Sequence, residues 1–176
     1  KFTPYGQIII NFSPEEKATQ PVPVNASEDL FFQALDSEYL GDWRHAEKTY
    51  KQVLNTNPDH ADALVNLGNI RHHAGHTKEA EQCYRRALYA DPDHVEGNYN
   101  LANLLEDRQE LDNAVLFYAK SVHEEPEFAD AHFNLGMVLE KLGNLKDAEK
   151  HWRIYLDLDP DGEWADYLRT RLDEEH

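Results

Sequence analysis

Apolar and polar residues alternate along the chain in a pattern that returns every 34 positions. The stretch from Ala61 to His94 shows one full unit, in which Gly75 joins two amphipathic segments. Three independent series keep this spacing: Ala46, Ala80, Ala114 and Ala148; Tyr50, Tyr84, Tyr118 and Trp152; and Pro58, Pro92, Pro126 and Pro160. Three positions with one common period indicate an internal repeat, and therefore a stack of similar units.

The repeat predicts four units, each made of a first helix, a turn and a second helix. The units span residues 27–60, 61–94, 95–128 and 129–162. Glycine is expected at the turn of three units and glutamine at the turn of the other: Gly41, Gly75, Gln109 and Gly143. The residues expected to cap second helices are Asp42, Thr77 and Asn144.

Small residues on both helices of a unit predict that the two helices pack closely. They are Ala34, Gly68, Ala102 and Gly136 on the first helices, and the alanine series named above on the second. After the last unit, apolar residues fall on one face of a further predicted helix: Trp164, Tyr167, Leu168 and Leu172. We expect residues 163–176 to form a capping helix that ends the stack.

The unit resembles the tetratricopeptide repeat (TPR), a family whose period is 34 residues. The residues that carry the resemblance in the second unit are Leu67, Gly68, Ala80, Tyr84, Ala87 and Pro92. The resemblance covers residues 27–162 and implies an all-α fold, a right-handed superhelix (α-solenoid) of four repeats plus the capping helix. The segments NLGN, HWRIYLDLDP and WADYLRTRL are similar to those of bacterial TPR proteins. Some of these carry a helix-turn-helix regulator domain ahead of the array.

Residues 1–26 precede the repeats and do not share their pattern. The stretch Gln7–Phe12 is β-branched and apolar and predicts a short strand, and the following residues predict an extended, Pro-rich linker. Because no second strand is predicted, we expect the arm Phe2–Phe12 to be ordered by another copy of the chain. Strand pairing between two arms is favoured by three consecutive isoleucines, and docking in the other copy's groove is the second form. The alternative is that the arm is the end of a domain preceding Lys1, since the chain is expected to be an excised fragment.

The 176 residues carry a formal net charge of −17, which argues against a nucleic-acid-binding surface and favours a neutral or basic partner. The single cysteine, Cys83, excludes an internal disulfide. No apolar run approaches the roughly 20 residues that span a membrane. We therefore expect a cytoplasmic protein that does not insert into membranes.

Asparagines recur on the first helices, which line the concave groove in TPR proteins. Asn66, Asn100 and Asn134 form a ladder, and Asn69 and Asn103 lie three positions further on, on nearly the same face. A carboxamide offers an acceptor and two donors, so it can pair with the backbone of an extended peptide. The surrounding segments are similar to the TPR arm of the O-linked N-acetylglucosamine transferase, in which an asparagine ladder holds the peptide backbone. A hydrogen bond within the fold is the other interpretation of these residues.

Three further ladders run beside the asparagines. One is acidic: Glu28, Asp62, Glu96 and Asp130. A second is mostly acidic: Glu38, His72, Glu106 and Glu140. The third is apolar: Phe31, Val65, Tyr99 and Phe133. Apolar groups within a polar rim are typical of binding surfaces, and the carboxylates would attract Arg or Lys. A merely solvated acidic surface is the alternative.

His72, His73 and His76 are candidate metal ligands, but Gly75 interrupts the helical spacing, so we expect a solvent-facing cluster without a metal or cofactor. The sequence contains no phosphate loop and no nucleophile elbow. It therefore predicts a non-enzymatic scaffold that binds a neutral or basic protein segment or extended peptide in its groove. The alternative is a regulatory or oligomerisation module, for example that of a bacterial transcriptional regulator whose N-terminal domain lies outside this chain.

Overall fold

The computed structural model describes residues 26–174, and within this range the chain is a series of nine α-helices. The helices are α1 (Ala26–Tyr39), α2 (Trp43–Thr56), α3 (Ala61–His73), α4 (Thr77–Ala90), α5 (Val95–Asp107), α6 (Leu111–Glu124), α7 (Ala129–Lys141), α8 (Leu145–Leu158) and α9 (Ala165–Glu174). The all-α prediction is confirmed. The expected arm Phe2–Phe12 and its linker lie outside the described residues.

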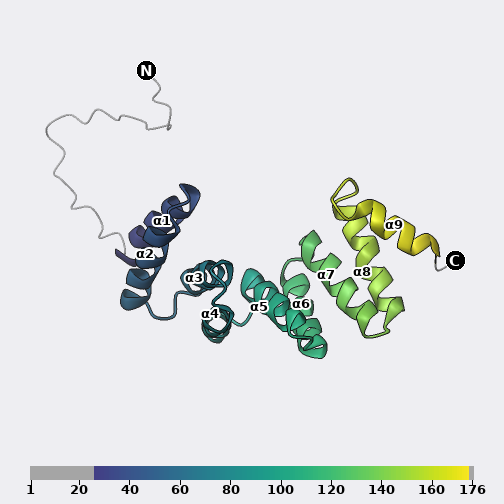
Figure 1. The fold of residues 1–176 in the computed structure, drawn as a ribbon, viewed down its shortest axis with the longest axis horizontal. Helices are drawn as coiled ribbons and strands as arrows, with labels where there is room; N and C mark the ends of the chain where they lie inside the picture. The colour runs from purple at the N-terminus through teal and green to yellow at the C-terminus, as the bar shows by residue number, and fades with distance from the viewer. Residues whose placement is uncertain (1–25, 175–176) are drawn as a thin grey trace, which may run out of the picture.

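The first eight helices form four pairs that stack in chain order, and α9 follows the last pair. The two helices of each pair pack on each other, the second helix of each pair packs on the first helix of the next pair, and α8 contacts α9. The stack follows an arc from α1 at one end to α9 at the other (Figure 1). Because every pair contacts only its neighbours, the stability of the solenoid depends on the interfaces between pairs.

The turns within the pairs are as predicted. Gly41, Gly75 and Gly143 have φ angles of 74°, 79° and 79°, a left-handed conformation that glycine adopts without steric strain. Gln109 takes the same place in the third pair with a φ of 62°. Left-handed backbone at a side-chain-bearing residue is uncommon, so the third turn departs from the rule that the other three follow.

The helix N-caps agree with the sequence in part. Asp42 caps α2, since its carboxylate accepts a hydrogen bond from the His45 amide at 3.0 Å. Thr77 was expected in this role but is the first residue of α4, and His76 is the N-cap. Asn144 stands at the N-cap of α8, but its side chain donates to the Asp147 carboxylate instead of accepting from the backbone.

Histidines cap two first helices, a feature that the sequence did not indicate. The Nδ1 atoms of His60 and His94 accept hydrogen bonds from the amides of Ala63 and Gly97, at 3.4 and 3.1 Å. A neutral imidazole has one ring nitrogen free to accept. His60 and His94 therefore satisfy an amide at the start of α3 and α5 that would otherwise lack a partner.

The core lies along the interface between first and second helices. The small residues predicted on both helices are buried, and so are the large rings beside them: Tyr50, Tyr84, Tyr118 and Trp152. After the last pair, α9 buries Ala165, Leu168 and Leu172 against the same core, so the predicted helix is present and packs on the last pair. No helix that the structure describes has the length and apolarity needed to span a bilayer.

Candidate functional site

The three ladder asparagines lie on successive first helices, one in each of α3, α5 and α7, and each side chain is partly exposed. We call the surface that carries Asn66, Asn100 and Asn134 the ladder face. Phe32 occupies the equivalent position in α1 and is 60% exposed. The fixed repeat spacing therefore places one carboxamide per unit on a common surface, beginning with the second unit.

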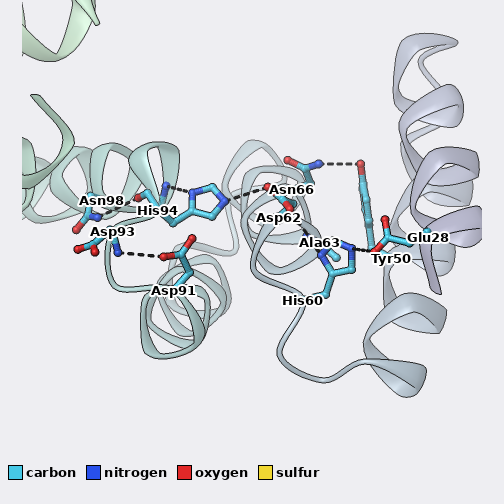
Figure 2. Close-up of polar contacts among 11 residues, drawn as sticks. Glu28, Tyr50, His60, Asp62, Ala63, Asn66, Asp91, Asp93, His94 and Asn98 are labelled. Atoms are coloured by element: carbon cyan, nitrogen blue, oxygen red, sulfur yellow. Dashed lines mark hydrogen bonds and ion pairs between the residues drawn. The ribbon is translucent and has the colours of Figure 1, made fainter. Parts of the chain in front are cut away.

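Each ladder carboxamide donates through its Nδ2 atom to the preceding unit. Asn66 donates to the Tyr50 hydroxyl at 3.0 Å (Figure 2). Asn100 donates to the Asn69 side-chain oxygen at 2.9 Å. Asn134 donates to the Asn103 side-chain oxygen at 3.2 Å and to the Tyr99 hydroxyl at 3.0 Å. The asparagines therefore hydrogen-bond one unit to the next and are held in fixed orientations.

Asn69 and Asn103, predicted to lie in the groove, accept the bonds from Asn100 and Asn134. Their side-chain oxygens also accept from the tyrosine on the second helix of their own unit, Tyr84 at 2.8 Å and Tyr118 respectively. Burial raises the pKa of both phenols, so the hydroxyls stay protonated and continue to donate at neutral pH. The sequence showed these tyrosines only as a core series and did not indicate their polar role.

The ladder side chains keep part of their hydrogen-bonding capacity. Among the described residues, the Oδ1 atoms of Asn66, Asn100 and Asn134 make no hydrogen bond, and none is a buried unsatisfied atom. A carboxamide oxygen can accept two hydrogen bonds. The ladder face therefore presents three oriented acceptors, one per unit.

The apolar ladder is less open than expected. Val65 is fully buried, because Gly97 brings the backbone of α5 close to it, and so it cannot contact a ligand in this arrangement. Tyr99 and Phe133 remain partly exposed, but each is covered on one side by a ring from the chain that follows. The Tyr99 ring lies 4.7 Å from that of Phe128, and the Phe133 ring stacks on Trp164 at 5.0 Å.

The first acidic ladder is exposed. Asp62, Glu96 and Asp130 all lie at the surface, near the starts of α3, α5 and α7. Two of them, Asp62 and Glu96, line a surface depression of about 390 Å³ together with further carboxylates and His94. The His94 Nε2 atom lies 3.2 Å from the Asp62 carboxylate (Figure 2). This part of the surface therefore has a strongly negative potential.

The second acidic ladder is largely paired within the chain. Lys141 binds the Glu106 carboxylate at 2.6 Å, Arg171 of α9 binds Glu140, and Glu38 accepts from the Tyr50 hydroxyl at 2.5 Å. These carboxylates hold neighbouring elements together and contribute less to the surface potential than the sequence suggested. The negative charge available to a partner is therefore concentrated on the first acidic ladder.

The three histidines that were candidate metal ligands lie at one turn of the second unit. His72 and His73 lie at the end of α3, and His76 follows the turn. Among the residues that the structure describes, no group of three or more His, Cys, Asp or Glu side chains has an arrangement that could hold a metal ion.

A histidine pair between α7 and α8 gives a pH prediction. His132 Nε2 lies 3.1 Å from the Pro126 carbonyl and must donate to it, so its Nδ1 accepts from His151 Nδ1 at 2.9 Å when both rings are neutral. Burial lowers the pKa of both histidines below the ordinary value of about 6.5. The unfolded chain therefore takes up protons first, and the stability that this pair contributes is lost as the pH falls below about 6.5.

Replacing the pair by its counterparts in the third unit should remove this pH dependence. Asn98 stands at the position of His132 and donates to the Pro92 carbonyl at 3.0 Å, and Phe117 stands at the position of His151. In chemical denaturation at pH 7 and pH 5, the double variant His132→Asn/His151→Phe should lose less stability on acidification than the wild type. The losses of the two chains should differ by at most about 1.4 kcal/mol per pH unit for each histidine replaced. Equal losses in both chains would show that the pKa values of the two histidines are the same in the folded and the unfolded chain.

A comparison with protein families finds one that accounts for most of this chain. A model described as tetratricopeptide repeat matches residues 33–93, 74–125 and 99–163. No curated protein sequence matches the chain.

Solved structures with the same arrangement of helices are numerous. PilF of Pseudomonas aeruginosa is 20% identical over 85% of this chain and 70% of its own, with a TM-score of 0.72. MamA of Desulfovibrio magneticus RS-1 is 22% identical over 79% of this chain and 78% of its own, with a TM-score of 0.63. A tetratricopeptide repeat protein of Parabacteroides merdae is 25% identical over 84% of this chain and 62% of its own, with a TM-score of 0.67. At these levels of sequence identity, the similarity to the solved structures concerns the fold alone.

Proposed function

Because the chain belongs to the tetratricopeptide repeat family, whose fold typically serves as a non-catalytic scaffold for protein interactions, we propose that it binds an extended segment of a partner protein along the ladder face. The observation that carries this proposal is the set of three oriented acceptors, the Oδ1 atoms of Asn66, Asn100 and Asn134. Their Nδ2 atoms are engaged within the solenoid, so binding does not require the side chains to be ordered first.

Backbone amides of an extended peptide are suitable donors for these acceptors. Such contacts give affinity without reading the peptide's side chains, so specificity must come from the surrounding groups. The exposed edges of Tyr99 and Phe133 offer apolar contact, and the carboxylates of the first acidic ladder favour Lys or Arg. The partner segment is therefore neutral or basic.

Removing the three ladder carboxamides should weaken peptide binding. A peptide selected from a random library on the full chain is the probe, and its affinity is measured by calorimetry. The variant Asn66→Ala/Asn100→Ala/Asn134→Ala should bind it more weakly by about 0.5–1.5 kcal/mol for each neutral hydrogen bond lost. The variant also loses the bonds between units, so the measurement is made at a temperature where circular dichroism shows a fully folded chain.

The matched control separates binding from stability. Tyr84→Phe/Tyr118→Phe removes the hydroxyls that bond to Asn69 and Asn103 but leaves the ladder carboxamides in place. It should lower the free energy of unfolding by about 0.5–1.5 kcal/mol per hydroxyl and leave the peptide affinity unchanged. If the asparagine variant loses stability and still binds the peptide with wild-type affinity, the ladder serves only the fold and the proposal is wrong.

The charge of the partner is tested by association kinetics. A selected peptide containing Lys or Arg should associate faster at low salt, and this advantage should disappear as the ionic strength rises. Asp62→Asn/Glu96→Gln/Asp130→Asn should remove most of the salt dependence. The control neutralises three carboxylates on second helices, Asp112, Glu124 and Asp157, and so changes the net charge equally. Equal effects of the two variants, or selection of acidic peptides, would contradict the assignment of the acidic ladder to the binding surface.

A further inference from the structure

A second surface feature lies apart from the ladder residues. A cavity of about 700 Å³ opens between the start of α2 and the end of α3. Its lining residues are Trp43, Arg44, Glu47, Ile70, His73 and Ala74, and we call it the Trp43 pocket. A volume of this size is within the range of about 300–1,000 Å³ that is usual for binding pockets.

The turn that leads into this pocket is unusually apolar for an exposed turn. Trp43 is 55% exposed, and Tyr39 and Leu40, just before it in the chain, are 92% and 79% exposed. The position of Trp43 is taken by smaller side chains in the other units: Thr77, Leu111 and Leu145. The aromatic group is therefore not a requirement of the repeat, and its exposure indicates a contact beyond the described solenoid.

We propose that the apolar segment Ile8–Phe12 of the same chain docks in the Trp43 pocket. The segment offers four large apolar side chains within five residues, and the pocket offers the Trp43 ring, Ile70 and Ala74. The segment contains no Lys or Arg, so the carboxylates of the first acidic ladder offer it no ion pair on the ladder face. Residues 1–14 contain no Asp or Glu, so the net charge of −17 does not oppose their approach.

The connection between segment and pocket is long enough for docking within one molecule. Residues 13–25 separate the segment from α1, and a Pro-rich stretch of this length reaches about 40 Å. The 14 residues of α1 rise about 21 Å, and Trp43 follows the end of α1 by four residues. The linker can therefore run back along α1 to the pocket. A short tether gives a local concentration in the millimolar range, which favours this arrangement over docking on a second copy.

Disulfide trapping in the full chain tests the proposal. In a Cys83→Ala background, Ile9→Cys is combined either with Ala74→Cys in the pocket or with Lys48→Cys on α2, which is not a lining residue. Under mild oxidation, the intramolecular disulfide should form at least ten times faster with Ala74→Cys than with Lys48→Cys. Adding Trp43→Thr, the residue that the second unit carries at this position, should abolish the preference.

Each other outcome overturns the proposal. Equal rates with Ala74→Cys and Lys48→Cys would show that the segment has no preference for the pocket. Disulfides that form mainly between molecules would make a second copy the occupant. A preference that survives Trp43→Thr would show that the segment lies near Ala74 without depending on the Trp43 ring, which contradicts the proposed site. If Trp43→Thr reduces the helix content, Ile10→Asp makes the same test, because it alters the segment and leaves the solenoid unchanged.

Discussion

Deleting Trp164 to His176 is expected to lower the free energy of unfolding by at least about 3 kcal/mol and to make the chain associate as its concentration rises. Leu168 and Leu172 are buried against the core, and a buried leucine contributes about 1.5–3 kcal/mol. The deletion also uncovers Tyr155, which is buried, and the face of Phe133 that stacks on Trp164. Newly exposed aromatic surface at the end of a solenoid favours contact between copies.

Thermal melts and light scattering at two or more concentrations check this expectation. Thr170→Ala is a suitable control, because Thr170 is exposed on the same helix and its substitution should change stability by no more than about 0.5 kcal/mol. Leu168→Ala should lie between the control and the deletion, since it leaves the remaining contacts of α9 in place. An unchanged melt and a monomeric deletion variant would show that α9 is not required to close the stack.

The features that the sequence predicted well depend on residues within one unit. The period, the helix pairs and the left-handed turns at Gly41, Gly75 and Gly143 follow from local rules that repeat every 34 positions. Even the exception at Gln109 was evident, because the repeat fixed where the turn had to be. These features depend on residues close together in the chain, so aligning the four units with one another was sufficient to predict them.

The features that were missed depend on how one unit sits on the next. Val65 is buried because Gly97 lets α5 approach it, and Phe133 is covered because Trp164 precedes α9. The Asn100–Asn69 and Asn134–Asn103 bonds also join different units, and the sequence indicated a hydrogen bond within the fold only as the alternative to peptide binding. The repeat pattern shows that equivalent residues share a face, but it does not give the rotation between units. The small residue at position 97 was the one available signal of close approach.

Replacing Trp152 by alanine is expected to lower the free energy of unfolding by about 3–5 kcal/mol, the usual range for removing a large buried ring. Trp152 is the largest of the fully buried side chains in the described chain and lies between α7 and α8. Its position depends on Gly136, because a Cβ atom there would lie 2.3 Å from Nε1 of the indole. Chemical denaturation of the folded variant measures the loss.

The effect of Gly136→Ala on the free energy of unfolding should depend on the ring at position 152. Gly136→Ala alone should destabilise the chain, since overpacking costs about 1–3 kcal/mol and exceeds the gain of up to about 1 kcal/mol from replacing glycine in a helix. In a Trp152→Tyr background the same substitution should cost less stability, because the third unit packs Ala102 beside Tyr118 in the equivalent places.

The polar atoms of the indole and phenol rings do not oppose the substitution Trp152→Tyr. The indole Nε1 of Trp152 is buried without a partner, so its loss removes no hydrogen bond, and a tyrosine hydroxyl in its place is expected to reach Glu140 as Tyr118 reaches Glu106. A double-mutant cycle of Gly136→Ala and Trp152→Tyr measures the coupling between the two positions. The double variant should be more stable than the sum of the two single effects predicts if ring size decides the packing. Additive effects would show that Gly136 is required for another reason.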